Sequence, residues 1–534
     1  MSRFELELAP VREGRKWAGF EVSYRAELES VAAGELLFSV PERIVSIPGT
    51  PYVTEDLHAA DEHGTLPLVE LEASEDSSGR YRRWAADRDL QGALQLRFFA
   101  PVRPHDKLTP VGPLFDLRAE DLGLFGAGIT FLPLPGEVVY GPGGPEFDIS
   151  LTWRLENGVR AISSHGAGDA EWQGPLSSVS FALYGAGEPQ TITSGGFSLQ
   201  AFAETPFELE EVAEYAAKAH AAFAEFFEDE AARYAVLVRK NLGKGTGGTA
   251  FPDSFAFGFS AVDETSAAEL RSLLAHETAH NWPTLHDDHQ KISWYTEGTA
   301  EYYSHVLPLR AGFLSAQDFA AQLTDRFQGY DSNALRTLDS NAASASYWSD
   351  PRAQRIPYGR GLRYLIATDL QLRAATDGVT SLDDIVLDIL RTQRTGELVG
   401  VDGWLSRVTA VLGSAAEEHF RSMHAGDLIE LSDTAFEGIV RPVPVIIDEY
   451  ELGFDPASYR SEGRRIAGLR DGSRAALAGL REGDELVDHA LPYHAVRRSD
   501  REIAIAVIRD GEPLSFTYLP AGESVQSVRW EVQS

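Results

Sequence analysis

The residues of this chain best suited to chemistry are two histidines four positions apart with a glutamate between them. His276 and His280 enclose Glu277 in the pattern H-E-x-x-H, and Glu297 follows seventeen positions after His280. On a helix, residues four apart project from one face, so both imidazoles can bind one metal ion while the glutamate acts as general base. Two histidines and a glutamate leave the fourth position of a tetrahedral zinc ion open for water. The pattern predicts one zinc ion bound by His276, His280 and Glu297.

Three side chains can be given roles in the hydrolysis that such a site performs. Zinc lowers the pKa of a bound water to about 7, and Glu277 would take a proton from that water and pass it to the leaving amine. Glu301, one helical turn after Glu297, is placed to accept a hydrogen bond from a ligand histidine; the alternative is a solvated helix residue. Tyr358 heads a predicted helix and is the candidate donor to the oxyanion; the alternative is core packing.

The segments around the motif have the patterns of helices joined by a polar loop. Residues 267–275 carry apolar side chains at 270, 273 and 274, which form one buried stripe of a helix. Residues 299–305 continue helically after Glu297. His286 and His289 fall in the intervening loop, and we expect them to be loop residues because the tetrahedral set is already filled.

Changes in hydrophobic periodicity and in proline and glycine content divide the chain into three parts. Residues 1–200 hold short alternating runs such as Leu94–Phe99, separated by proline and glycine, which predicts a β-sandwich-like domain. Residues 201–440 are mostly of helical spacing with two strand-like runs. Pro442–Pro444 reads as a boundary, and residues 441–534 return to short strands with one small helix. The predicted fold class is multidomain α+β.

The composition excludes several classes of function. The 534 residues include 81 Asp and Glu against 47 Lys and Arg, which gives a net charge of −34. Such an acidic surface repels phosphates and anionic lipid head groups, so we expect neither nucleic-acid nor membrane partners. The absence of cysteine excludes disulfides and thiolate zinc ligands. Since no secretory signal and no run of ~18 apolar residues is found, we expect a cytoplasmic protein.

The residues described above resemble the gluzincin zinc metallopeptidases, and among them the glycyl aminopeptidase family, whose members carry a C-terminal PDZ domain. The resemblance rests on H-E-T-A-H-x-W at residues 276–282, on W-x-x-E-G at 294–298, and on Y-G-R-G at 358–361, where the family has Y-x-K-G. Residues 468–484 are similar to the PDZ stretch GSPAxxAGLxxGD, with Arg474 in place of the proline.

The resemblance implies a fold and an activity. It implies a thermolysin-like catalytic domain within residues 201–440, a PDZ-like domain at 441–534, a zinc cofactor and aminopeptidase action on peptide substrates. It also implies that Tyr358 helps to stabilise the transition state.

One element departs from the family pattern. In the family, a glycine-rich edge strand ends in G-G-x-E-H, and by analogy its glutamate holds the free α-amine of the substrate. Here the candidate substrate-binding residues are Gly247, Gly248, Thr249 and Ala250, with alanine at the glutamate position. A charge-assisted hydrogen bond is worth ~1.5–3 kcal/mol, so its loss would weaken recognition of a free N-terminus about ten- to a hundred-fold.

Aminopeptidase action remains the prediction, and two alternatives stay open. The first is a zinc endopeptidase or oligopeptidase, which the alanine at 250 favours. The second is a zinc-containing protein that binds peptides without cleaving them.

The C-terminal domain also allows two interpretations. Glu451-Leu452-Gly453-Phe454 resembles the loop with which a PDZ domain binds a C-terminal carboxylate beside an added strand. The domain would then capture peptide C-termini. The alternative is a packing domain that frames the catalytic cleft.

Overall fold

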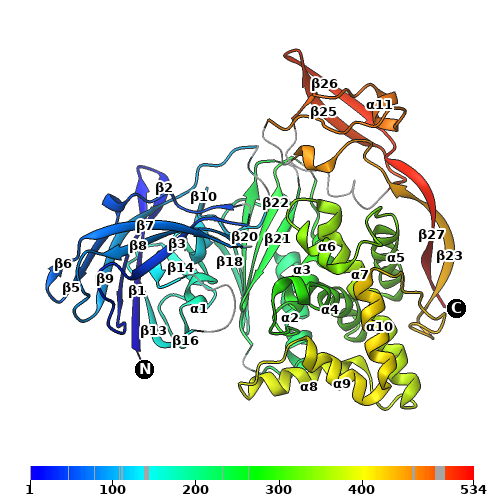
Figure 1. The fold of residues 1–534 in the computed structure, drawn as a ribbon, viewed down its shortest axis with the longest axis horizontal. Helices are drawn as coiled ribbons and strands as arrows, with labels where there is room; N and C mark the ends of the chain where they lie inside the picture. The colour runs from blue at the N-terminus through cyan, green and yellow to red at the C-terminus, as the bar shows by residue number, and fades with distance from the viewer. Residues whose placement is uncertain are drawn as a thin grey trace. The chain divides into compact units, whose positions relative to one another are not determined.

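The structure is a computed structural model that describes the chain except for residues 1, 46, 77, 108, 110–111, 138–143, 231, 244, 263, 460–462, 488–498 and 534. The chain forms two compact units, Met1–Ala217 with Ala231–Leu270, and Lys218–Glu230 with Arg271–Ser534. Sheets dominate the first unit and helices the second (Figure 1). The multidomain α+β architecture is therefore confirmed, while the three-part division at residues 200 and 440 stays a prediction.

A seven-stranded sheet lies at the start of the first unit. Its β9 strand alternates buried and exposed residues, which places Leu94, Leu96 and Phe98 in the core and leaves the opposite face to solvent. The strand order is β16 (Ala170–Pro175), β13 (Glu146–Trp153), β1 (Ser2–Glu13), β2 (Lys16–Ala26), β9 (Leu94–Pro101), β5 (His58–Asp61) and β6 (Gly64–Thr65). Only the β1–β13 pair is parallel among these described pairings.

Two five-stranded sheets and three short helices complete this part of the unit. One sheet has the order β12 (Leu134–Pro135), β3 (Leu36–Ile44), β8 (Gly79–Ala86) and β7 (Leu68–Glu75), with β4 (Ile47–Pro48) paired to β3. The other has the order β10 (Arg118–Glu120), β11 (Gly123–Ala127), β17 (Leu183–Gly187), β14 (Arg160–Ser163) and β15 (Gly166–Ala167). The short helices are η1 (Thr54–Asp56), η2 (Gly128–Thr130) and α1 (Ser177–Ser180).

A fourth sheet holds the glycine-rich strand that the sequence marked for substrate binding. Its order is β18 (Gln190–Ser194), β19 (Phe197–Ala201), β20 (Tyr234–Asn241), β22 (Ser254–Ser260) and β21 (Gly247–Phe251). Within the described residues, β21 pairs with β22 alone and is therefore an edge strand. The α2 helix (Leu209–Phe226) runs from the first unit into the second.

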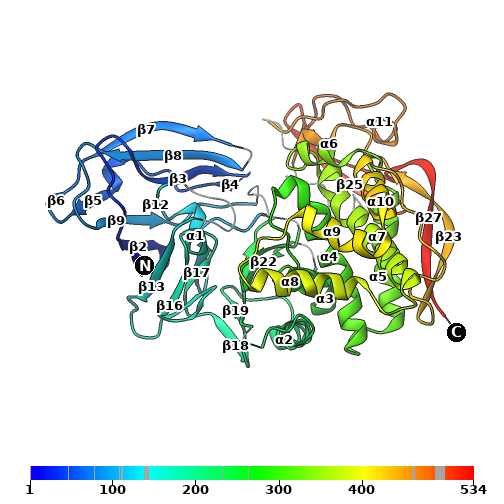
Figure 2. The ribbon, with the colours of Figure 1, turned by 60° about the horizontal axis from the view of Figure 1, so that its bottom comes forward.

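The second unit is built on a set of helices (Figure 2). The helices are α3 (Ala267–Ala279), α4 (His289–Arg310), α5 (Ala316–Asp331), α6 (Ser340–Ala345), α7 (Pro351–Ala375), α8 (Leu382–Arg394), α9 (Val401–Leu412) and α10 (Ser414–Ala425). Some of them start with ordinary side-chain caps: the Ser315 hydroxyl accepts the amide of Asp318, and the Asp350 carboxylate caps α7 ahead of a proline. No described helix is both long enough and apolar enough to cross a bilayer.

The C-terminal part of this unit consists of a long ribbon and a small sheet. The ribbon, β23 (Val440–Tyr450) with β27 (Ala521–Val532), lies along α5 in both views (Figure 1, Figure 2). The small sheet orders β24 (Glu485–Leu486), β25 (Ile503–Arg509) and β26 (Glu512–Tyr518), with η3 (Pro456–Tyr459) and α11 (Arg474–Ala478) nearby in the chain. It has a hydrophobic core of its own, which includes Phe454 and Ile505.

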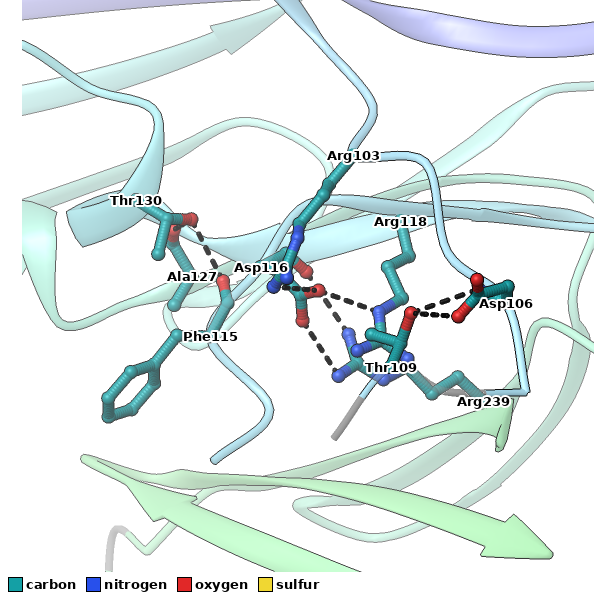
Figure 3. Close-up of polar contacts among 9 residues, drawn as sticks. All are labelled: Arg103, Asp106, Thr109, Phe115, Asp116, Arg118, Ala127, Thr130 and Arg239. Carbon is teal, nitrogen blue, oxygen red and sulfur yellow. Dashed lines mark hydrogen bonds and ion pairs between the residues drawn. The ribbon is translucent and has the colours of Figure 1, made fainter. Parts of the chain in front are cut away.

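One buried carboxylate in the first unit gathers three arginines. Asp116, only 1 % exposed, accepts hydrogen bonds from Arg239 Nη2 at 2.9 Å, Arg118 Nε at 2.7 Å and Arg103 Nη1 at 3.2 Å (Figure 3). Burial alone would raise the pKa of Asp116, but the charges of Arg239 and Arg118 outweigh it and lower that pKa to about 2. The Asp116 carboxylate therefore links β10 and β20 with the segment around Arg103, which precedes β10 in the chain.

Replacing this carboxylate, Asp116→Asn, should lower the free energy of unfolding by about 3–5 kcal/mol, because buried arginines lose their counter-charge. The unfolded carboxyl has a pKa of ~3.9, so its contribution is complete above about pH 4 and is lost as pH falls through about 2. Urea unfolding at several pH values measures this. Glu70→Gln, which breaks the exposed pair with Arg82, is the control and should cost under ~1 kcal/mol. A penalty for Asp116→Asn that persists unchanged at pH 2 would contradict the assignment.

Candidate active site

Three side chains of the second unit point their metal-binding atoms at one place. Nε2 of His276 lies 3.2 Å from Nε2 of His280 and 3.3 Å from Oε2 of Glu297. Nε2 of His280 lies 3.7 Å from the same oxygen. Zinc bonds of about 2.0–2.1 Å in a tetrahedron separate the ligand atoms by about 3.3–3.4 Å, so this spacing fits zinc. In the described part of the chain, it is the one group of His, Asp and Glu side chains arranged to hold a metal ion.

The charge states of His280 and Glu297 also suit a metal ion. Burial lowers the pKa of His280 to about 4, so its ring is neutral at pH 7 with a lone pair available. Burial would also raise the pKa of Glu297, but its close contact with His276 and the other neighbouring imidazoles together lower that pKa, so the carboxylate is ionised. Its Oε2 atom is buried and accepts no hydrogen bond from any described residue. A cation would satisfy this oxygen.

The α3 helix and the turn after it position the two histidines. His276 lies in the last turn of α3, and His280 follows directly after its final residue, Ala279. The chain is then fixed by Trp282, whose Nε1 donates to Asp229 at 3.0 Å and whose ring stacks on Phe227 at 5.3 Å. The helix begins at residue 267 as expected, but it ends before the second histidine of the motif.

Glu277 and Tyr358 lie beside the three convergent groups. The ring of Tyr358 stacks on that of His276, with centroids 5.6 Å apart and planes at 13°. Burial raises the pKa of the Tyr358 hydroxyl, and the nearby charges of Glu297 and Glu277 raise it further. The hydroxyl is therefore protonated at neutral pH and can donate a hydrogen bond. Glu277 is half-buried, so it can exchange protons with solvent.

Glu301 lies on the far side of His276 from the convergent atoms. Its Oε1 atom is 3.5 Å from Nδ1 of His276, and the residue is 2 % exposed. The solvated-residue alternative is therefore wrong.

The other two histidines and a tyrosine complete the surroundings. The backbone amide of His286 donates to the Val399 carbonyl at 2.8 Å, which fixes the loop before α4. His289 is the first residue of α4, where a loop residue was expected, and its ring meets Tyr347 edge-on at 5.4 Å. Neither histidine belongs to the metal-binding group. Nothing in the spacing of Tyr347, which is buried and adjoins Tyr358, marked it in the sequence.

Comparison with known proteins agrees with this geometry. The family model of the M61 glycyl aminopeptidases matches residues 269–358, the segment that contains both histidines, Glu277, Glu297 and Tyr358. The chain is a zinc metallopeptidase that resembles the glycyl aminopeptidases. No curated protein matches its sequence.

One solved structure resembles this metallopeptidase in fold over nearly its whole length. An aminopeptidase N family protein from Idiomarina loihiensis has a TM-score of 0.64 at 16 % identity, with 98 % of each chain covered. An M1 zinc metallopeptidase from Deinococcus radiodurans has a TM-score of 0.47 at 18 % identity, covering 80 % of this chain and 94 % of the other. The first of these shows that nearly the whole length of this metallopeptidase follows an aminopeptidase N family fold.

The candidate substrate-binding residues of the metallopeptidase all lie in β21. Gly248 is packed so closely that a Cβ there would lie 2.1 Å from the ring of Phe255. The Thr249 hydroxyl accepts the backbone amide of Leu114 at 2.9 Å, which fixes this strand from a loop. Ala250 is paired in register with Phe255 on β22.

Two glycines bring α4 and α7 into backbone contact in the metallopeptidase. A Cβ on Gly298 would lie 2.7 Å from the Gly361 backbone, and a Cβ on Gly361 would lie 2.0 Å from the Trp294 carbonyl oxygen. Glu297 directly precedes the first glycine, and Tyr358 lies one turn before the second. The close approach of the two helices therefore places Tyr358 beside Glu297, the candidate metal ligand.

Gly361→Ala should push these helices apart, because backbone atoms cannot yield to a Cβ. We expect a loss of about 1–3 kcal/mol of stability and, since a shift of about 1 Å misplaces Tyr358, a fall of about a hundred-fold in kcat. Thermal unfolding and steady-state kinetics measure the two effects. Gly403→Ala in α9 is the matched control, because the nearest atom there belongs to the Val399 side chain. Wild-type kcat in Gly361→Ala would show that the helix contact does not set the geometry.

Proposed function

We propose that this metallopeptidase is an aminopeptidase that hydrolyses peptide bonds with one zinc ion. His276, His280 and Glu297 would hold the ion. The observation that carries this proposal is the spacing of their three donor atoms, 3.2 to 3.7 Å apart, around one point. A zinc ion held there would polarise the scissile carbonyl and lower the pKa of the attacking water.

Three side chains around that point would carry out the remaining steps of the hydrolysis. Glu277 would accept the proton of the attacking water and deliver it to the leaving amine. Tyr358, protonated and stacked on His276, would donate to the oxyanion as it forms. Glu301 would hold the His276 ring in the tautomer that presents Nε2.

The finer domain assignments belong to the same proposal. Residues 1–200 would be a β-sandwich-like domain, 201–440 a thermolysin-like peptidase domain and 441–534 a PDZ-like domain in a cytoplasmic enzyme. Support for the last comes from its separate core and from Gly453, whose φ of +87° suits the turn of a carboxylate-binding loop. Peptide C-termini would be its ligands.

A second candidate function is favoured by Ala250. This residue stands where the resemblance implies a carboxylate for the substrate α-amine, and alanine cannot pair with an ammonium. An endopeptidase or oligopeptidase would use the same zinc chemistry without needing that carboxylate.

A peptide mixture, half of it acetylated at the N-terminus, tests these alternatives by mass spectrometry with zinc-loaded and chelated protein. Loss of single residues from free N-termini only would support the aminopeptidase. Chelator-sensitive internal cuts that ignore acetylation would establish endopeptidase action. Absence of any cleavage would favour a peptide-binding protein.

The assigned roles of Glu277 and Glu297 predict opposite defects. Glu277→Gln should keep zinc through dialysis but lose several orders of magnitude in kcat, because the proton acceptor is removed. Glu297→Ala should lose zinc, because one of three ligands is missing. Metal analysis and kinetics on both variants distinguish the two roles. An active Glu277→Gln variant or a zinc-retaining Glu297→Ala variant would refute the respective assignment.

Restoring the missing carboxylate provides a gain-of-function prediction. Ala250→Glu should increase the preference for free over acetylated N-termini about ten- to a hundred-fold, through a charge-assisted hydrogen bond to the α-amine. The ratio of kcat/KM for the two peptide sets measures this preference. Ala250→Gln, similar in size but uncharged, is the control. An unchanged ratio would mean that another group already holds the amine.

A further inference from the structure

A buried arginine lies behind the metal-binding histidine. Nε of Arg326 is 2.6 Å from Oε2 of Glu301, and both side chains are largely buried. The other oxygen of Glu301 faces Nδ1 of His276 at 3.5 Å. Arg326 therefore connects to the metal centre through one carboxylate.

The same guanidinium also reaches the helix that carries His276. Nη2 of Arg326 donates to the Ser272 hydroxyl at 3.0 Å, and Ser272 lies one turn before His276 on α3. Glu301 belongs to α4 and Arg326 to α5. The Arg326 guanidinium thus connects α3, α4 and α5 close to Nδ1 of His276.

The helix that carries Arg326 is held in place by the C-terminal ribbon. On α5, the Thr324 hydroxyl accepts the amide of Trp530 at 2.9 Å, and the ring of Phe327 packs edge-on against Trp530 at 5.3 Å. Asp331 accepts the Ser527 hydroxyl at 2.6 Å. The C-terminal ribbon therefore fixes the helix segment from which Arg326 projects.

We propose that Arg326 is a positioning residue for the metal site, an inference that rests on the proposed function. An isolated Glu301 carboxylate in this buried place would be free to turn towards other donors. With Oε2 bound to Arg326, the remaining oxygen faces Nδ1 and orients the His276 ring so that Nε2 points at the ligand position. Planar bidentate reach is a property of arginine that lysine lacks.

The experiment measures zinc affinity by competition with a chelator, together with the visible spectrum of the cobalt-substituted protein. Arg326→Met should weaken zinc about ten- to a hundred-fold and alter the cobalt spectrum, because outer partners of a ligand histidine tune its binding. Arg326→Lys keeps the charge but contacts fewer groups, so its zinc affinity should lie between those of the wild type and Arg326→Met. Its spectrum decides the question if the methionine variant does not fold.

Arg509→Met is the matched control. Arg509 on β25 forms a similar, largely buried ion pair with Asp484, 2.6 Å long, and does not contact Glu301 in the described structure. It should lower the melting temperature without changing zinc affinity. Wild-type affinity and spectrum in both Arg326 variants would overturn the positioning role. Unchanged zinc affinity in His276→Ala would instead overturn the proposed function itself.

Discussion

The backbone contact between α4 and α7 is the constraint on which the candidate site depends most. Glu297 and Tyr358, the proposed metal ligand and oxyanion donor, come from two different helices, and neither helix alone could set their separation. Gly298 and Gly361 let the two backbones approach until a single methyl group would not fit. The positions of Glu297 and Tyr358 follow from that approach, because each residue lies within one turn of its glycine.

Buried charge is the second organising feature. The chain is strongly acidic, yet several of its arginines lie inside, among them Arg118, Arg239 and Arg360. Each contacts oxygens inside the protein: Arg239 and Arg118 bind Asp116, and Arg360 donates to two backbone carbonyls. The guanidinium, always charged and planar, can serve two acceptors at once, which explains its use at these positions.

The residues of the candidate site could be predicted from the sequence better than the contacts that hold them in place. H-E-x-x-H and a later glutamate have a fixed geometric meaning, so the convergence of His276, His280 and Glu297 could be expected. The contacts of Arg360, the arginine of Y-G-R-G, could not be predicted in the same way. Its guanidinium donates to the carbonyls of residues 336 and 338. Its direction depends on long-range packing, which no local pattern encodes.

The fold was predictable at the same coarse level. Alternating strands early in the chain and helical spacing later gave the α+β architecture. The division into units was not visible, because α2 begins in one unit and ends in the other, and its apolar pattern does not change where it crosses. Tyr347 was missed for a related reason: a single aromatic residue between helices has no periodicity.

Residues 218–230 have a consequence for how this peptidase can be divided. They precede most of the first unit's last sheet in sequence, yet Phe223, Phe227 and Asp229 contact Trp282, two residues after the candidate ligand His280. A fragment that began at residue 271 would contain every proposed catalytic group and still expose that tryptophan. The unit that holds these groups is thus discontinuous in sequence, and three strands of the first unit's last sheet, β20, β21 and β22, lie between its two segments. Any excised form of this unit must therefore include residues 218–230, because they cover Trp282.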